Sequence, residues 1–296
     1  MRIVFDRPSS IDYLADIIQG NMKGVILAGG KGLRLYPLTK VTNKHLLPVG
    51  REPMILNPVR KLVEAGISDI LVVTSTEHMG SMVNLLGSGQ EFGCRFTYKV
   101  QDEAKGIAHA LALAENFSGG DKIAVILGDN ITSASLKPYV EKFFQQEKGA
   151  LVLVKKVDDP TRYGVAVLDE QQVVAIEEKP QNPKSNFAVL GYYMYDPKVF
   201  EIIRQLRPSA RGEYEITDVN NEYIRRKELA FEVLDGLWTD AGTFESLLYA
   251  NQFLMGTQAA PRTGTEPHLV SEEQISDMVK ELEKKIQELK KHRHSG

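Results

Sequence analysis

A glycine-rich loop with two adjacent cations follows the first strongly apolar run of this chain, in the stretch GVILAGGKGLRLYPLT. Gly29, Gly30 and Gly32 let the backbone turn tightly and present its N–H groups to an anion without a Cβ in the way. Lys31 and Arg34 add positive charge, and a guanidinium can grip two phosphate oxygens at once. The pattern predicts a phosphate-binding loop, because an ordinary turn would explain two glycines but not three beside two cations.

Two familiar nucleotide-binding loops do not fit this stretch. A dinucleotide-binding fingerprint needs a third glycine at the position of Leu35, and Pro37 interrupts the helix that should begin there. The P-loop pattern G-x-x-x-x-G-K-[ST] is absent from the sequence. The loop is therefore expected to hold phosphate in another way.

Two aspartates far apart in the chain end apolar stretches and could share a cation. Asp129 follows the run KIAVILG, and Asp240 lies in WTDAG, just before a helix that Thr243 could cap. Two carboxylates and phosphate oxygens together form the hard, all-oxygen ligand set that Mg²⁺ prefers. From the residues alone, a role in a turn or a helix cap explains each aspartate as well as a metal-binding role does. Asn130 is interpreted as a turn residue.

These residues need a scaffold that brings strand ends together. The runs GVILA, DILVVTS, RFTYKVQ and KIAVILGDN are typical of strands, and the stretches between them, PMILNPVRKLVEAG, GIAHALALAENF and LKPYVEKFFQQEKG, are typical of amphipathic helices. A strand-dense second half contains ALVLVKKV, YGVAVLD, VVAIEEK and NFAVLGYYMYD. The pattern predicts an α/β fold with a mostly parallel, mixed sheet and helices on both faces, and ligands bind such sheets at the carboxyl ends of strands.

The ends of the chain differ in composition from the middle, which predicts four regions. Residues 1–21 are interpreted as an N-terminal extension, native or a fusion segment, and residues 22–254 as the domain. Residues 255–270 form a predicted linker, and residues 271–296 a predicted amphipathic helical tail. The apolar residues of that tail follow a heptad seam: Ile275, Val279, Leu282, Ile286 and Leu289. We expect the tail to engage a partner, another subunit or its own chain.

Composition excludes several classes of protein. The formal net charge is −3, so the chain offers no bulk attraction for nucleic acid or an acidic membrane, and local cations must meet any anionic ligand. The single cysteine, Cys94, excludes an internal disulfide and is expected to be a small buried hydrophobe. No run approaches the roughly 20 apolar residues of a membrane-spanning helix, and the N-terminus lacks signal-peptide character, so a cytoplasmic protein is expected.

A series of ordered motifs runs from Met22 to about Leu254: LAGGKGLRLYPLT, NKHLLPV, VQDEAKGIAHAL, VILGDNI, DPTRYGVAVLD, EEKPQNPKSNFAVLGYYMYD, PSARGEYEITDVN and WTDAGTFESL. Together they resemble the sugar-nucleotide pyrophosphorylases, most of all the short bacterial glucose-1-phosphate thymidylyltransferases. The resemblance implies a single Rossmann-like nucleotidyltransferase domain and a Mg²⁺-dependent reaction. In that reaction an oxygen of glucose-1-phosphate attacks the α-phosphorus of dTTP, and dTDP-glucose and pyrophosphate form without a covalent enzyme intermediate.

The resemblance also implies roles for individual residues. The implied catalytic residues are Arg34, Lys44, Lys179 and Asp129. The implied nucleotide-binding residues are Leu27, Gly29, Gly30, Arg34, Gln101, Gly106 and Asp129, with the Gln101 amide on the pyrimidine edge. The implied sugar-phosphate-binding residues are Tyr163, Gly164, Glu178, Lys179, Val189 and Arg211. The implied Mg²⁺ ligands are Asp129 and Asp240.

Other residues depart from the family pattern or are expected to stand beside the site. His45 is interpreted as a neighbour of the site and not as an acid or base, and Glu213 and Glu215 as the start of the next helix. Leu33 is bulkier than the Ser or Thr of many relatives, so a small shift of the loop is expected, and Ala241 replaces a threonine. The tail matches nothing in the family, so the resemblance carries no regulatory nucleotide site over to it.

Two alternatives stay open. Uracil differs from thymine by one methyl group, which a pocket discriminates by only about 1–3 kcal/mol, so a UTP-using or dual-specificity enzyme is the nearest rival. A non-catalytic sugar-nucleotide-binding regulator is more remote, because it would have no use for the charges of Arg34, Lys44, Asp129, Lys179 and Asp240. By analogy with relatives, a homo-oligomer is expected. From the net charge, no nucleic-acid or membrane partner is expected.

Overall fold

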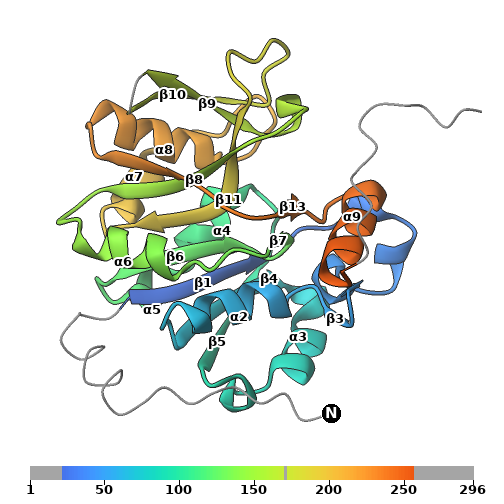
Figure 1. The fold of residues 1–296 in the computed structure, drawn as a ribbon. Coiled ribbons are helices and arrows are strands. Elements are labelled where there is room, and N and C mark those ends of the chain that lie inside the picture. The colour runs from blue at the N-terminus through green and yellow to red at the C-terminus, as the bar shows by residue number, and fades with distance from the viewer. Residues whose placement is uncertain (1–21, 170–171, 257–296) are drawn as a thin grey trace, which may run out of the picture. The chain divides into compact units, whose positions relative to one another are not determined.

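The computed structural model describes residues 22–169 and 172–256, and Figure 1 shows their fold. The predictions for the N-terminal extension, for most of the linker and for the helical tail lie outside the described residues. Within the part that is described, no helix is long and apolar enough to cross a membrane.

A mixed sheet organises the described residues. Its strands are β1 (Met22–Ala28), β4 (Asp69–Ser75), β5 (Arg95–Gln101), β6 (Lys122–Leu127), β8 (Ala150–Lys156), β9 (Gly164–Asp169), β10 (Gln172–Glu178), β11 (Phe187–Tyr195) and β12 (Leu229–Val233). Their order is β10-β9-β11-β6-β1-β4-β5, and β8 pairs with both β11 and β12. Two small ladders join β2 (Pro48–Val49) to β3 (Glu52–Pro53) and β7 (Asn130–Thr132) to β13 (Trp238–Asp240).

Strand direction divides the sheet into two halves. β1 runs parallel to β4 and β6, and β4 parallel to β5, whereas β11 runs antiparallel to β6, β8 and β9. In the parallel half, Leu27 of β1 lies opposite Val73 of β4 and Leu127 of β6. The carboxyl ends of these strands therefore meet at one edge, which places the glycine loop after β1 beside the Gly128-Asp129 turn after β6.

Helices cover both faces of the sheet, as the alternating pattern predicts (Figure 1). They are α2 (Leu56–Glu64), α3 (Met79–Leu86), α4 (Ile107–Ala112), α5 (Glu115–Ser118), α6 (Lys137–Gln145), α7 (Val199–Gln205), α8 (Ile216–Arg225) and α9 (Phe244–Leu254). One core cluster contains buried residues of α2, α3 and α6, and the other those of α4, α7 and α8. The expected helix over GIAHALALAENF is broken, because Leu113 and Ala114 close a tighter turn with i→i−3 hydrogen bonds.

A third, smaller core cluster fixes the loops around the site. It joins the loops after β1, the β7–β13 ladder and α9, and its buried members are Leu35, Leu47, Val49, Met54, Ile131, Ala241 and Ala250. Thr243 caps α9 as predicted, in a capping box with Ser246. β13 ends at Asp240 and α9 begins at Phe244, so this cap also fixes the direction of the segment that carries Asp240.

Candidate active site

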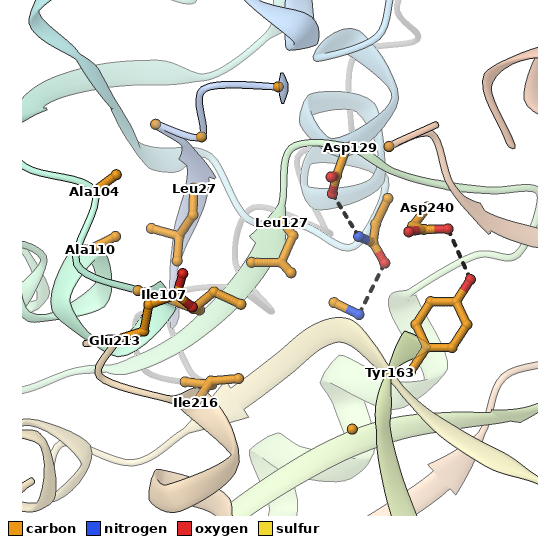
Figure 2. A pocket seen from close by; sticks show the side chains of 18 of the residues that line it. Leu27, Ala104, Ile107, Ala110, Leu127, Asp129, Tyr163, Glu213, Ile216 and Asp240 are labelled. Atoms are coloured by element: carbon orange, nitrogen blue, oxygen red, sulfur yellow. Dashed lines mark hydrogen bonds between the residues drawn. The ribbon is translucent and has the colours of Figure 1, made fainter. Parts of the chain in front are cut away.

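A large pocket with a volume of about 870 Å³ opens at the carboxyl ends of β1, β5 and β6. Most of the predicted site residues line it: Leu27, Gly29, Gly30, Arg34, Lys44, Gln101, Gly106, Asp129, Tyr163, Gly164, Glu178, Lys179, Val189 and Asp240. Arg211 is not among the lining residues, but its Nη2 lies 3.3 Å from Glu178 Oε1. Figure 2 shows the two aspartates at one end of the pocket and Leu27, Ile107 and Ile216 at the other.

The glycine loop after β1 is held from inside the protein. Gly32 has a φ of 63°, and a Cβ there would lie 2.8 Å from Thr39 Cγ2, so glycine is strongly favoured at this turn. Thr39 Oγ1 donates a hydrogen bond to Gly32 O at 2.9 Å. Leu35 is fully buried and shares a short 3₁₀ helix with Arg34. The burial of Leu35 therefore anchors the turn that places Arg34 at the pocket.

Lys44 and Asp129 form a buried ion pair, with Lys44 Nζ 2.5 Å from Asp129 Oδ2. Asn43 caps the 3₁₀ helix that carries Lys44: its Oδ1 accepts from the His45 N–H at 2.8 Å, and its Nδ2 donates to Ala28 O at 3.2 Å. Burial alone would raise the pKa of Asp129, but the charge and hydrogen bond of Lys44 hold that pKa well below its usual range. Asp129 is therefore an ionised group that already faces a cation.

His45 is buried in the wall beside this ion pair. Its Nδ1 lies 2.6 Å from Asn43 Oδ1, and its ring packs so closely that a Cβ on Gly128 would lie 2.7 Å from its Cδ2. The Asn43 amide nitrogen donates elsewhere, so its oxygen accepts and His45 Nδ1 carries the proton. Burial first, and the charge of Lys44 second, lower the pKa of His45 to about 3. This neutral ring is in keeping with the interpretation of His45 as a neighbour of the site.

The two aspartates come together because two short strands pair. Asp240 on β13 lies opposite Asn130 on β7, and the Ala241 N–H donates to Asp129 O at 2.8 Å. Tyr163 Oη donates to Asp240 Oδ1 at 3.0 Å (Figure 2). Burial first, and the charge of Asp129 second, raise the pKa of Asp240. Two carboxylates thus share a poorly solvated place, where a cation would relieve their repulsion.

Asn130 is not a turn residue, and that interpretation was wrong. It is buried at the start of β7, where its Nδ2 donates to Asp129 Oδ1 at 3.0 Å. Its Oδ1 accepts from the Gly191 N–H at 3.0 Å and from Trp238 Nε1 at 2.9 Å. The Trp238 ring in turn lies edge-on to Tyr163, with 5.5 Å between ring centroids. Asn130 and Trp238 therefore connect the environments of the two aspartates, and sequence reasoning missed both.

Where β10 and the start of α8 line the pocket, charged and polar side chains are paired with one another. Thr217 Oγ1 donates to Glu178 Oε2 at 2.5 Å, and Arg211 Nη2 lies 2.9 Å from Glu215 Oε2. Lys179 follows β10 with a φ of 43°, a left-handed conformation that is uncommon without glycine. Glu215 stands at the start of α8, as predicted. Thr217 lines the pocket and was missed, because a threonine in the first turn of a helix carries no distinctive signal.

At the opposite end of the pocket, two glycines bring the backbone close to Gln101 and to the loop before α8. A Cβ on Gly29 would lie 2.6 Å from Gln101 Oε1, so a side chain there would displace the amide. Gly106 has a φ of 100°, and a Cβ on it would lie 2.5 Å from Tyr214 O. Glu213 lies before α8 and lines the pocket, so its interpretation as part of that helix was wrong.

The donor atoms at Asp129 and Asp240 fit a divalent metal that shares its coordination with a ligand. Among residues 22–169 and 172–256, no group of three or more His, Cys, Asp or Glu side chains could hold a metal by itself. Carboxylate oxygens are hard donors, and Mg²⁺ is commonly bound by one or two of them together with substrate phosphates and water. The pair therefore suits a hard cation that arrives with a phosphorylated ligand.

The fold and the pocket suit an enzyme that acts on phosphorylated ligands, and comparison with known proteins shows the family. A family model described as "Nucleotidyl transferase" matches residues 23–256. The chain belongs to the nucleotidyl transferase family. It is 45% identical over 241 residues to a glucose-1-phosphate thymidylyltransferase from Neisseria meningitidis, covering 80% of this chain and 84% of that protein. It is 44% identical over 236 residues to the Mycobacterium tuberculosis enzyme of the same name, covering 79% and 82%.

Solved structures agree with this family. A Bacillus anthracis protein assigned as a glucose-1-phosphate thymidylyltransferase, in complex with sucrose, is 57% identical, has a TM-score of 0.77, and covers 81% of this chain and 97% of its own. A UDP-glucose pyrophosphorylase complexed with UDP-glucose is 28% identical, with a TM-score of 0.72, and covers 80% and 100%. The predicted resemblance to sugar-nucleotide pyrophosphorylases is thereby confirmed, as is the predicted α/β fold.

Proposed function

We propose that this chain transfers a thymidylyl group from dTTP to glucose-1-phosphate, giving dTDP-glucose and pyrophosphate. The two bacterial relatives described above are named for this activity. The observation that carries the proposal is the meeting of Asp129 and Asp240 at the pocket that the glycine loop and Arg34 also line. Carboxylates that hold a cation, combined with N–H groups and a guanidinium, stabilise the charge that develops on phosphates during transfer.

The nucleotide is proposed to lie across the parallel half of the sheet. Its triphosphate takes the N–H groups of Gly29 and Gly30, with Arg34 facing the two phosphates that leave as pyrophosphate. Leu27, Gly106 and the amide of Gln101 lie at the same pocket and are proposed to hold the nucleoside. This part of the pocket is called the nucleotide end from here on. Arg34 thereby stabilises charge on the leaving group, which is where a fixed cation lowers the barrier most.

Glucose-1-phosphate is proposed to bind where Glu178 and Lys179 line the pocket, a part called the sugar end from here on. Glu178 accepts hydrogen bonds from sugar hydroxyls, Tyr163, Gly164 and Val189 form the walls, and Lys179 and Arg211 bind the phosphate. An oxygen of that phosphate attacks the α-phosphorus of dTTP, and the bond from the α-phosphorus to the pyrophosphate oxygen breaks. The second pKa of a phosphate monoester is about 6, so the attacking oxygen is largely ionised at neutral pH and requires no general base. The neutral His45, which is not required as an acid or a base, agrees with this chemistry.

Asp129 and Asp240 are the residues proposed to hold Mg²⁺, which when bound would screen the negative charges that must approach one another. Lys44 is proposed to exchange its present partner, Asp129, for a phosphate oxygen when the nucleotide enters. Tyr163 and Asn130 each donate one hydrogen bond to Oδ1 of an aspartate and so fix the direction of its Oδ2. In the free protein, Oδ2 of Asp129 faces Lys44 Nζ, and Oδ2 of Asp240 lies 3.7 Å from Arg162 Nη2.

One experiment tests the proposed function. Pyrophosphate release is measured with glucose-1-phosphate against dTTP, UTP, CTP, ATP and GTP, with and without Mg²⁺. We expect release with dTTP that depends on Mg²⁺. Equal release with UTP would identify the dual-specificity alternative, which the hydrogen-bonding edge shared by thymine and uracil favours. No release with any triphosphate would contradict the proposal.

A further inference from the structure

The amide of Gln101 is held between two neighbours at the nucleotide end of the pocket. On one side, its Oε1 lies where a Cβ on Gly29 would be only 2.6 Å away. On the other side, its Nε2 lies 3.2 Å from Nδ1 of His109. Gln101 is buried at the end of β5, and its side-chain oxygen, Oε1, accepts no hydrogen bond from the described part of the chain. The amide is thus oriented by one nitrogen contact, with its oxygen left for a ligand.

His109 is itself held in a defined position. It lies on α4, whose first turn is joined to the loop before α8: the Ala108 N–H donates to Tyr214 O at 3.1 Å, and the Tyr214 N–H donates to Lys105 O at 2.8 Å. The imidazole stacks on the ring of Tyr214, with 6.1 Å between centroids and 25° between planes. Gly106 permits this close approach because any Cβ there would collide with Tyr214. The plane and position of the imidazole are therefore set by the backbone around it.

We propose that His109 is a positioning residue that fixes which end of the Gln101 amide meets the nucleobase. The proposed ring carries its only ring proton on Nε2, so that Nδ1 accepts from the amide nitrogen of Gln101. While the proton is on Nε2, a flipped amide would place Oε1 against the Nδ1 lone pair, with two acceptors in contact. His109 therefore selects the orientation in which Gln101 presents its carbonyl oxygen beside Gly29.

This orientation gives the pocket a preference among pyrimidines, and the inference rests on the proposed function. Thymine and uracil carry a donor at N3, which the fixed Gln101 oxygen accepts. Cytosine carries an acceptor at N3 and a donor at N4, so it would bind well only if the amide flipped. Because His109 opposes that flip, it discriminates against cytosine without touching the base.

The test measures binding of dTDP and dCDP by calorimetry to the whole protein and its variants. His109→Phe keeps a ring to stack on Tyr214 but removes the acceptor, and it should shrink the preference for dTDP over dCDP about tenfold. Tyr214→Phe keeps the ring and should leave the preference unchanged. In a Gln101→Ala background, His109→Phe should have no further effect, because the amide through which it acts is gone. An unchanged preference in the His109→Phe variant, or an equal loss in both backgrounds, would overturn the proposal.

A second measurement needs no variant and keeps the proposal testable if His109→Phe does not fold. In wild-type protein labelled with ¹⁵N-histidine, the NMR shifts of His109 should show a proton on Nε2 and none on Nδ1. A proton on Nδ1 would refute the proposed orientation. Diphosphate binding and the tautomer are both independent of turnover, so failure of the proposed transfer reaction would be seen separately, as absence of pyrophosphate release.

Discussion

At the proposed nucleotide end of the pocket, glycines let the main chain line the cavity, whereas at the proposed sugar end charged side chains come from strands and loops. The nucleotide end is formed by parallel strands and by Gly29 and Gly106, where a Cβ would lie too close to Gln101 or to Tyr214. The sugar end is formed by antiparallel strands and carries Glu178 and Arg211, which are paired with each other. The two ends solve the problem of binding anions and hydroxyls in different ways.

The difference determines how much each end must reorganise when a ligand binds. Thr39 and the buried Leu35 hold the glycine loop in place, so the proposed binding of phosphate by its N–H groups requires little reorganisation. Side chains at the sugar end satisfy one another in the free protein, so a sugar phosphate must replace existing partners. We therefore expect substitutions at the nucleotide end to act through shape and those at the sugar end through charge.

The largest effect is expected where the two ends meet, at Asp240. Asp240→Asn retains the size of the side chain and an oxygen for the Tyr163 hydroxyl, but removes the negative charge. We expect kcat to fall by about 10²–10³-fold, the usual cost of losing one group that stabilises transition-state charge. Steady-state rates at saturating Mg²⁺ measure this, and thermal unfolding checks the fold. A rate equal to that of the wild type would remove Asp240 from the proposed metal site.

Gly106→Ala tests the nucleotide end. The new Cβ would lie 2.5 Å from Tyr214 O at a φ of 100°, so strain of about 1–3 kcal/mol is expected, with a raised KM for dTTP. Gly93→Ala is the matched control, because Gly93 has a φ of 73° with nothing within 4 Å of its Cβ, and it should cost only the backbone penalty of about 1–2 kcal/mol. Urea unfolding and nucleotide kinetics of both variants provide the comparison. Equal nucleotide KM values would show that close approach at Gly106 is irrelevant to binding.

Lys179→Ala tests the sugar end. Loss of a charge-assisted contact worth about 1.5–3 kcal/mol should raise the KM for glucose-1-phosphate about 10–100-fold, with a smaller change for dTTP. Lys184→Ala is the control, because Lys184 is an exposed lysine that pairs with Glu177 outside the pocket. Parallel changes in both Michaelis constants would argue that Lys179 acts on the whole pocket and not on the sugar phosphate.

The smallest effect is expected far from both ends, at Cys94. Its Sγ lies 3.6 Å from Gly89 O, and burial raises the pKa of the thiol from 9.0 to about 12. The folded state keeps its proton while the unfolded state loses it, so this group lowers folding stability as pH rises from 9.0 towards about 12. A thiol reagent at mildly alkaline pH should modify Cys94 only after unfolding; rapid labelling of the native protein would contradict its burial.

The residues that stand in ordered motifs at strand ends could be predicted from the sequence. The residues that only position those side chains, by hydrogen bonds to distant segments, could not. Asp129 follows an apolar strand and is therefore visible as a polar group at the edge of a sheet. Asn130 is the next residue, but its hydrogen bonds to Gly191 and Trp238 depend on chain segments far away in sequence. Periodicity carries no information about such contacts, so an asparagine after a strand resembles an ordinary turn.

The helices illustrate the same limit. The helical pattern over GIAHALALAENF correctly indicated helical residues, but the break between α4 and α5 follows from local backbone geometry. Glu213 has the charge expected near a helix N-terminus, yet the chain before α8 runs along the pocket instead. Here the tertiary contact of Tyr214 with the Gly106 loop decided the path of the chain.

The position of Trp238 makes its intrinsic fluorescence a probe of the two aspartates. It is the only tryptophan in the sequence, and its indole N–H is bonded to the asparagine that also holds Asp129. We expect a ligand or cation that moves Asp129 to alter the surroundings of that indole through Asn130, and hence its emission. Occupancy of the proposed metal site could then be followed by intrinsic fluorescence, without a label and without a chemical step.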